Sequence, residues 1–497
     1  MLEGERSYQR GQGNLVPSNN ASSIPESPVI PKAQEKPWYI QHFTKLLIGF
    51  GLGGGAIAIL LPWMLWLLCG MSSGSSDQLR LHLLYVTGGI IAVLTLLQTN
   101  WKNQGDRLKI DADIKKNEQD AEKNERDHIR QVHAERRSRY TKAVEQLADE
   151  KATVRLGGIY TLVGLVDEWI TDNTLNPEER QEEGQVIINN LCSYVRSPFP
   201  LARKAEVLES DIEPTDYEGN FPKDQAAFRE EQDVRRTIFV EISKRSSTFT
   251  RDGIGKVIDT FPGIWSDFEF DFSRAPIFYP LSNLTIEKGN FSSAKFYAGT
   301  NFVEATFTSN ANFRAATFTS YADFVMATFI SNANFSSAIF TSNANFVAAT
   351  FTNNADFYET RFTSDADFCW ATFTSNTDFH RTRFASNTDF QGARFTSIAN
   401  FSKATFTRRA IFFSTTFTQY GPSFTMAESE ERKAQFSAEA DPLDYDFSVS
   451  SESKPLKCGT ATLLSKSFTI PLGTVLYDPD SWDEEKQEYT RVSEPAQ

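Results

Sequence analysis

The sequence ANFRAATFTSY, residues 311–321, is followed by ADFVMATFISN, residues 322–332, and by ANFSSAIFTSN, residues 333–343. Each of these eleven-residue units has a phenylalanine at its third and eighth positions, so phenylalanines alternate with spacings of five and six. The pattern runs from Asn290 to Phe417 and contains twelve units. Its candidate structural residues are Phe291, Phe296, Phe302, Phe307, Phe313, Phe318, Phe324, Phe329, Phe335, Phe340, Phe346, Phe351, Phe357, Phe362, Phe368, Phe373, Phe379, Phe384, Phe390, Phe395, Phe401, Phe406, Phe412 and Phe417.

An eleven-residue period excludes a repeat of helical hairpins, which needs about thirty residues or more for two helices and their turns. The abundance of Thr, Asn, Asp and Phe also argues against one long amphipathic helix. The pattern predicts a solenoid of short extended segments in which every Phe points inward. The small residue two positions before most Phe residues, usually Ala or Thr, then points inward as well, because side chains of an extended chain alternate between its faces. Asn, Asp and Ser between the segments favour corners.

The triplet Ala-Asn/Asp-Phe resembles the pattern of the pentapeptide-repeat family, A-[DN]-[LF]-x-x. That resemblance implies a right-handed quadrilateral β-helix with four repeats in each coil. The chain departs from the family pattern by one extra residue in every second unit. If four faces still close a coil, two eleven-residue units form one coil and the twelve units form six, a rod of about 29 Å at about 4.8 Å per coil. The triplet occurs at Ala322-Asp323-Phe324, Ala333-Asn334-Phe335, Ala344-Asn345-Phe346, Ala355-Asp356-Phe357, Ala366-Asp367-Phe368 and Ala399-Asn400-Phe401.

Two apolar runs precede the repeats, at residues 45–69 and 79–98. Each is about as long as the twenty residues that a helix needs to cross a bilayer, so together they predict a two-helix transmembrane hairpin. Lysine and arginine are frequent on the outer flanks of this hairpin and nearly absent from its connecting loop. The positive-inside rule therefore predicts an integral, multi-pass protein of the cell membrane with both termini in the cytoplasm.

Composition divides the rest of the chain into further segments. The Ser-, Asn- and Pro-rich start is expected to be disordered, and it lacks the apolar core of a signal peptide. Alternating charges after the membrane predict an exposed helix, and amphipathic periodicity then predicts three packed helices. Asp271–Ala275 is interpreted as a degenerate first repeat that caps the solenoid. In the acidic C-terminal tail, a strand-like piece at Ala461–Tyr477 is expected to pack on the open end of the solenoid, and the rest of the tail is expected to be mobile.

These segments predict a multidomain chain with a transmembrane hairpin, an α-helical bundle and a pentapeptide-repeat solenoid. Tyr140–Leu147 and Val154–Tyr160 also resemble a helical region of membrane-tethered actinobacterial proteins that often precedes pentapeptide repeats. The segments are a disordered tail at 1–37, the hairpin at 45–98, a charged juxtamembrane helix at 102–139, a small helical bundle at 140–198, a linker at 199–265, the β-helix at 266–420 and an acidic tail at 421–497.

The sequence contains little material for a chemical site. It has five His and four Cys in 497 residues, and the cysteines are isolated from one another. His128 and His133 would lie about 140° apart around a helix, which argues against a zinc pair. Gly253–Lys256 lacks the upstream glycine and the following Ser or Thr of a phosphate-binding loop. We therefore expect no catalytic residue, no cofactor and no metal.

Two hypotheses of function stay open at this point. The first is a non-enzymatic scaffold that is integral to the membrane and binds an unidentified protein partner, with self-association also possible. The second is a DNA-mimicking regulator of a nucleic-acid enzyme such as DNA gyrase, as some acidic pentapeptide-repeat proteins are. The net charge is −14, yet residues 301–420 contain 8 acidic and 8 basic side chains. Because imitation of DNA needs a dense surface of one sign, the scaffold is preferred and no nucleic-acid ligand is expected.

Overall fold

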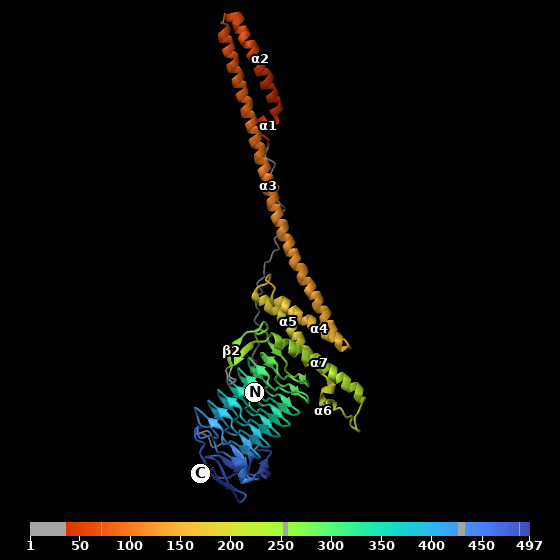
Figure 1. Cartoon of the computed structure of the whole chain (residues 1–497), viewed down its shortest axis with the longest axis vertical. Coiled ribbons are helices and arrows are strands. Elements are labelled where there is room, and N and C mark those ends of the chain that lie inside the picture. The colour runs from red at the N-terminus through yellow and green to blue at the C-terminus, as the bar shows by residue number, and fades with distance from the viewer. Residues whose placement is uncertain (1–35, 71, 252–256, 426–432, 487) are drawn as a thin grey trace, which may run out of the picture. The chain divides into compact units, whose positions relative to one another are not determined.

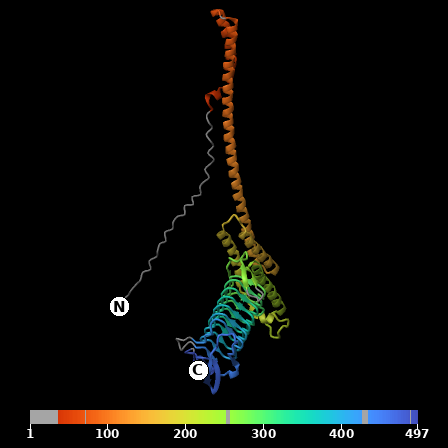
Figure 2. The same cartoon turned by 60° about the vertical axis from the view of Figure 1, so that its left-hand side comes forward.

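The computed structural model describes residues 36–70, 72–251, 257–425, 433–486 and 488–497. They belong to two compact units, residues 1–127 and 128–497, each with its own internal packing. Most of the predicted tail at 1–37 and the whole of Gly253–Lys256 lie outside the described residues. Figure 1 and Figure 2 show the helices and strands from two directions.

Two long apolar helices characterise the first unit. The short α1 (Trp38–Gln41) is followed by α2 (Phe43–Cys69), which ends at Gly70 with a left-handed φ of 66°. Helix α3 (Ser73–Leu147) then begins and is 75 residues long. Both α2 and α3 are long and apolar enough to cross a membrane. The predicted span at 79–98 and the charged helix at 102–139 are parts of this one helix, because no proline interrupts it.

Helices α2 and α3 approach each other closely at a glycine. A methyl group added to Gly54 would lie 2.2 Å from Cγ2 of Thr87, so only glycine fits at this contact. The Thr87 hydroxyl donates back to the carbonyl of Leu83 at 2.9 Å, which satisfies it inside its own helix. Small residues allow two membrane helices to pack tightly in this way. The glycines of α2 that have open space instead are Gly49, Gly51, Gly53 and Gly55.

The second unit begins with a helical layer, which contains more helices than the three that the sequence predicts. The end of α3 packs with α4 (Ala152–Ile170) and α5 (Pro177–Arg196), as the periodicity predicts. Helix α5 starts with a capping box, in which Asn176 and Glu179 satisfy each other's backbone N–H groups. The interpretation of 199–265 as a linker is wrong. This segment forms η1 (Pro200–Lys204), α6 (Ala205–Leu208), α7 (Phe221–Arg245), β1 (Thr248–Arg251) and β2 (Val257–Phe261).

The sequence analysis did not predict helix α7, because charged residues interrupt the apolar pattern of its buried face. Glu231 and Arg235 stand among its buried apolar residues, and Arg235 is only 1% exposed. The Arg235 Nε atom donates to Glu231 at 2.6 Å, and its Nη1 donates to the carbonyl of Val195 at 2.7 Å. A buried charge is tolerated only with such partners. The pair therefore ties α7 to the end of α5.

The solenoid consists of four parallel sheets, named A to D here in the order in which the chain visits them. Equivalent residues of neighbouring turns are 22 apart, as Ala333 and Ala355 are in sheet A. This confirms that two eleven-residue units form one turn. Two of the sheets hold seven strands, so the solenoid has about seven turns instead of six. The added turn comes from strands upstream of Asn290. The handedness and a four-sided cross-section stay predictions.

The strands are short, and most contain two residues. Sheet A comprises β3 (Phe270–Asp271), β6 (Gly289–Asn290), β9 (Ala311–Asn312), β13 (Ala333–Asn334), β17 (Ala355–Asp356), β21 (Thr377–Asp378) and β25 (Ala399–Asn400). Sheet B comprises β4 (Pro276–Ile277), β7 (Lys295–Phe296), β10 (Thr317–Phe318), β14 (Ile339–Phe340), β18 (Arg361–Phe362), β22 (Arg383–Phe384), β26 (Thr405–Phe406), β29 (Gln435–Ser437) and β33 (Val475–Tyr477). Sheet C comprises β11 (Ala322–Asp323), β15 (Ala344–Asn345), β19 (Ala366–Asp367), β23 (Thr388–Asp389), β27 (Ala410–Ile411) and β30 (Tyr445–Asp446). Sheet D comprises β5 (Thr285–Ile286), β8 (Thr306–Phe307), β12 (Thr328–Phe329), β16 (Thr350–Phe351), β20 (Thr372–Phe373), β24 (Arg394–Phe395) and β28 (Thr416–Phe417).

The interior of the solenoid is a stack of aromatic rings. All 24 repeat phenylalanines are at most 2% exposed. Rings of neighbouring turns lie almost parallel, as Phe335 and Phe357 do at 5.1 Å and 2°. Within a turn they meet edge to face, as Phe335 and Phe346 do at 5.7 Å and 87°. Both arrangements are favourable for aromatic pairs. The small residues two positions earlier, such as Ala333, are buried between the rings, as predicted.

Both ends of the ring stack are covered. At the first turn, Phe239 of α7 lies 4.5 Å from Phe272, so a helix covers the segment Asp271–Ala275 that was interpreted as the cap. At the last turn, Phe436 of β29 stacks on Phe406 at 4.9 Å. The expectation of a mostly mobile tail is wrong, because this tail adds strands to sheets B and C. It also forms η2 (Pro442–Asp444), β31 (Cys458–Leu463), β32 (Lys466–Pro471), η3 (Pro479–Ser481), β34 (Trp482–Asp483) and β35 (Glu488–Tyr489).

Candidate interaction surface

The 24 repeat phenylalanines are buried inside the solenoid and cannot contact a partner. A binding function of the solenoid must use the side chains that point outward. These are the residues of the corners and the first residue of several strands in sheets B and D, such as the exposed Arg361, whereas Thr306 and Thr328 at this position of sheet D are buried. The regular fold repeats each such position every 22 residues, so residues that are distant in the sequence form continuous rows.

Two rows of left-handed corner residues run along the rod. Every eleven-residue unit has a tight turn with one residue at a φ between 55° and 67°, which costs a non-glycine residue about 1–2 kcal/mol. The rows differ in character, because one ends in charged residues and the other contains exposed apolar ones. The charged row is Ser293, Ala315, Ser337, Glu359, Arg381 and Lys403. The apolar row is Glu304, Met326, Ala348, Trp370, Gly392 and Ser414.

Trp370 is the most conspicuous residue of the apolar row. Its side chain is 61% exposed, and its φ of 60° is an outlier for a bulky residue. A methyl group added to Gly392, one turn further along, would lie 2.6 Å from the Trp370 ring. The glycine therefore makes room for the indole to lie over the neighbouring corner. Met326, two turns earlier, is 54% exposed. Exposed aromatic side chains on a rigid support are typical contact residues of protein interfaces.

A basic groove lies between sheet B and the C-terminal segment Trp482–Pro495. Its volume is about 1350 Å³, and it extends along the strands β14 to β33. Tyr489 of the C-terminal wall accepts a hydrogen bond from Nη2 of Arg383 at 3.3 Å and stacks on Tyr477 at 4.1 Å. Six cationic and two anionic side chains line the groove: Arg361, Arg381, Arg383, Lys403, Lys433 and Lys486, with Glu359 and Glu488.

Within the described part of the chain, two of the cations that line this groove have a carboxylate partner, and one of them is Lys486, whose Nζ lies 3.6 Å from Asp483 Oδ2. Arg381 Nη1 donates to Glu359 Oε1 at 2.9 Å across neighbouring turns. This hydrogen bond, with a further one from Tyr358, holds the pKa of Glu359 below its usual range. The carboxylate therefore stays ionised and compensates one of the six cations. The remaining positive charge faces the groove.

The acidic residues that belong to strands of the rod lie on sheets A and C. Asp356 and Asp378 are in register in sheet A, and Asp367 and Asp389 are in register in sheet C. Each accepts a hydrogen bond from the backbone N–H two residues later, which fixes the corner. Burial raises the pKa of Asp356, and the neighbouring Asp378 raises it further. These carboxylates thus stabilise the turns of sheets A and C, whereas Arg361 and Arg383 are neighbours on sheet B.

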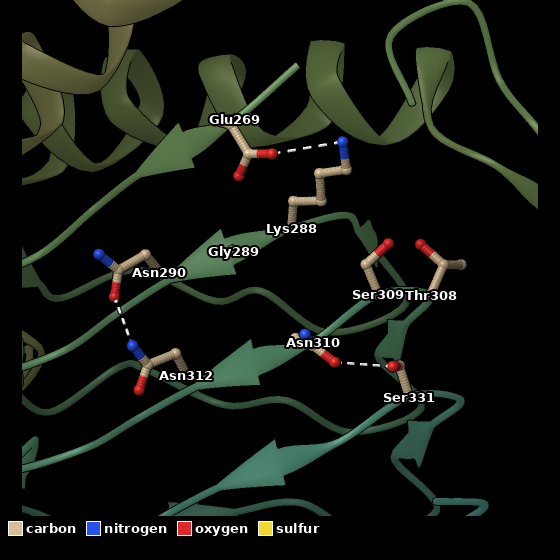
Figure 3. A pocket seen from close by; sticks show the side chains of 9 residues that line it. All are labelled: Glu269, Lys288, Gly289, Asn290, Thr308, Ser309, Asn310, Asn312 and Ser331. Atoms are coloured by element: carbon tan, nitrogen blue, oxygen red, sulfur yellow. Dashed lines mark hydrogen bonds and ion pairs between the residues drawn. The ribbon is translucent and has the colours of Figure 1, made fainter. Parts of the chain in front are cut away.

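A smaller polar hollow lies near the start of the solenoid (Figure 3). Its volume is about 470 Å³. Its groups bond with one another: Lys288 pairs with Glu269 at 3.3 Å, and Asn312 donates to Asn290 at 2.9 Å. The hydroxyl of Thr308 is buried and has no hydrogen-bond partner among the described residues. The other residues that line the hollow are neutral, and the charges of Lys288 and Glu269 cancel. The hollow therefore offers little net charge to a ligand.

The two histidines weighed for zinc occupy different surroundings. His133 lies 3.0 Å from Asp172, with its ring 5.1 Å from that of Trp169, whereas His128 is exposed. Burial raises the pKa of Asp172, but hydrogen bonds from Thr174, Arg136 and His133 outweigh burial and hold that pKa well below its usual range. His133 is thus part of an ion-pair cluster that joins α3 to the end of α4.

The described cysteines are free, and the carboxylates closest to one another already have a cation. Cys69, Cys192, Cys369 and Cys458 form no disulfide. Burial raises the pKa of Cys192 to about 12, which makes it an unreactive core residue. Glu439, Asp478 and Asp480 have oxygens within 4.8 Å of one another. Asp478 accepts a hydrogen bond from Arg491 at 2.5 Å, so a guanidinium compensates this cluster.

Sequence reasoning missed the basic groove because it counted charges without placing them. Equal numbers of acidic and basic residues between 301 and 420 indicate a neutral rod, yet Arg361 and Arg383 are neighbours on sheet B, whereas the paired aspartates lie on sheets A and C. The available signal was spacing. Arg361 and Arg383 are 22 residues apart, as are Arg381 and Lys403, and this is the period of one turn.

Comparison of the chain with protein-family models, with curated proteins and with solved structures found no match. The class of protein therefore rests on the architecture. The chain has two helices long and apolar enough to span a membrane and a parallel β-solenoid of about seven turns with a 22-residue period.

Proposed function

We propose that this protein is a membrane-anchored scaffold that binds a protein partner on the outer surface of its solenoid and has no catalytic activity. We also propose that the solenoid belongs to the pentapeptide-repeat family, with a right-handed, four-sided coil, in an actinobacterial membrane protein whose termini both face the cytoplasm. The Ala-Asn/Asp-Phe triplet and the visits to four sheets within 22 residues support this assignment.

One observation supports a binding role above all. The interior of the rod is filled with phenylalanine and alanine, whereas the outward rows vary in a way that the fold does not require. Alanine or serine, which stand at the equivalent corners Ala348 and Ser414, would serve as well as Trp370, which is exposed and adopts a disfavoured backbone conformation. Strained, exposed residues that a rigid scaffold holds in place commonly serve binding. The surface therefore supports recognition of a partner.

A shortened rod tests this function without exposing the interior. Deletion of residues 322–387 removes three whole 22-residue turns and joins Tyr321 to Thr388, which begins the equivalent strand of sheet C. Both end caps stay in the chain, while Met326, Trp370 and the arginines of sheet B are lost. Partners would be captured from membranes by cross-linking with the full-length chain and with the shortened chain. We expect a specific partner to be lost with the shortened rod.

The outcome decides between the rod and the helical part. Identical partners for both chains would refute binding on these turns and would favour the helical layer as the contact surface. Retained circular dichroism and membrane extraction behaviour of the shortened chain would show that it folds. Regulation of DNA gyrase stays the alternative, and inhibition of supercoiling by the full-length protein in detergent at stoichiometric amounts would favour it. The grouping of cations on sheet B argues against DNA mimicry, because phosphate imitation needs acidic surfaces.

A further inference from the structure

The arginines of sheet B are placed where the fold does not need them. Arg361 and Arg383 are the first residues of β18 and β22, and they are direct neighbours in the parallel ladder. Like charges at adjacent positions of a sheet are destabilising. Four other turns of sheet B have uncharged residues at the same position, namely Thr317, Ile339, Thr405 and Gln435, while Lys295 of β7 is separated from the arginines by two of them. The two arginines therefore weaken the free solenoid unless an anion lies against them.

The residues that the structure describes supply little counter-charge to the arginines of the groove. Among the described residues, Arg361, Arg383 and Lys403 have no carboxylate within ion-pair distance, and the single neutral partner of Arg383 is Tyr489. Arg361 and Arg383 are exposed, so their guanidinium groups are accessible. A guanidinium binds carboxylates through two parallel hydrogen bonds, which suits it to recognition of acidic side chains.

The shape of the groove favours an extended chain. It covers six consecutive strands of sheet B, from β14 to β33. At about 4.8 Å per turn this is about 24 Å, the length of about seven residues of extended polypeptide. The wall opposite the arginines is partly apolar, with Trp482, Tyr489 and Val492. A peptide in the groove could therefore present carboxylates to one side and apolar side chains to the other.

A long polyanion fits less well than a short one. The net charge of the groove is +4, from six cations and two anions, whereas the whole chain carries −14. A nucleic acid gains its affinity from many phosphate contacts along its length. Beyond the groove, such a strand would meet the acidic rows of sheets A and C. A short acidic segment would avoid this repulsion.

We propose that this basic groove binds an extended acidic peptide of about seven residues from the protein partner. This inference rests on the proposed scaffold function and names the chemistry of its ligand. The carboxylates of the peptide bind Arg361 and Arg383, with Lys403 at the next turn. The aromatic wall of Trp482 and Tyr489 contacts the apolar side chains between the carboxylates.

The test uses the full-length protein in detergent micelles and a fluorescein-labelled eight-residue peptide of alternating Glu and Val. Fluorescence anisotropy measures the dissociation constant. We expect the double variant Arg361→Gln, Arg383→Gln to bind at least tenfold more weakly. The matched control is Arg394→Gln, which changes an exposed arginine at the same strand position of sheet D and should leave binding unchanged. Replacement of Glu by Gln in the peptide should abolish binding.

A charge swap separates recognition from misfolding. The variant Arg361→Glu, Arg383→Glu should lose the Glu-Val peptide and gain affinity for the corresponding Lys-Val peptide. Equal binding of the Glu-Val peptide by the neutral double variant, or no binding to the unaltered protein, would overturn the proposal. Tighter binding of an oligothymidine of eight nucleotides than of the peptide would overturn it in favour of nucleic acid. The scaffold function would survive such results if the shortened rod still lost its cross-linked partner.

Discussion

Two buried threonines of the solenoid differ in a single hydrogen bond and allow a sharp test of its interior. Thr388 of sheet C is 1% exposed, and its hydroxyl has no hydrogen-bond partner among the described residues. Its ladder neighbours are Ala366 and Ala410. Thr382 is also fully buried, but its hydroxyl donates to the carbonyl of Phe357 at 2.7 Å. Replacement of each by valine keeps the shape of the side chain and exchanges only the hydroxyl for a methyl group.

The two changes should have opposite effects. A buried hydroxyl without a partner costs about 1–3 kcal/mol, whereas a made hydrogen bond contributes about 1 kcal/mol. Thr388→Val should therefore raise the local unfolding free energy by about 1 kcal/mol, and Thr382→Val should lower it by a similar amount. In a solenoid such changes stay largely local, because each turn contacts only its neighbours.

Hydrogen exchange of the full-length protein in micelles, read by mass spectrometry, measures this local free energy. Peptides that cover the affected turns should exchange about fivefold more slowly in Thr388→Val and about fivefold faster in Thr382→Val. Faster exchange in both variants would refute the reasoning, because it would mean that the Thr388 hydroxyl has a partner, such as an enclosed water.

Three other predictions concern the ring stack, the acidic corners and the helix pair. Phe357→Ala should lower the free energy of unfolding by about 3–5 kcal/mol, since it leaves a cavity between stacked rings; a loss below about 1 kcal/mol in a denaturant titration would contradict the stack. Asp356→Asn should stabilise the protein at pH 7, because burial raises the pKa of Asp356 in the folded state while Asn still accepts the bond from Tyr358. The unaltered protein gains stability as the pH falls through that raised pKa, so thermal melts of the two should converge toward pH 4, and a constant difference would contradict this sign. Gly54→Val should separate α2 from α3, since a methyl group at Gly54 would already lie 2.2 Å from Thr87; a disulfide cross-link engineered between the two helices should form much less readily, and unchanged cross-linking would contradict the contact.

The spacing of the phenylalanines was sufficient to predict the solenoid and the length of its turn. Spacings of five and six place every ring inward and make a turn of two units, and the sheet register repeats every 22 residues accordingly. The segments outside the repeats, which lack this spacing, were harder to predict. Helix α7 was interpreted as a linker because Glu231 and Arg235 interrupt its apolar stripe, and their burial depends on partners in α5.

One wall of the basic groove was predictable from the sequence. A row of residues is visible in the sequence once the 22-residue turn is known, so Arg361 and Arg383 could have been placed side by side. The second wall of the groove could not, because Trp482 and Tyr489 come from the tail after the repeats end. Their position depends on tertiary contacts such as the stacking of Tyr489 on Tyr477.

The difference between the repeating unit and the turn has a consequence for how such a chain can change its length. An insertion or deletion of 22 residues moves every later side chain along the rod and returns it to its original sheet. A change of eleven residues keeps every phenylalanine inward but carries later residues from sheet B to sheet D, or from sheet A to sheet C. Half-turn mutations would therefore preserve the core while they move a binding row to the opposite side of the protein.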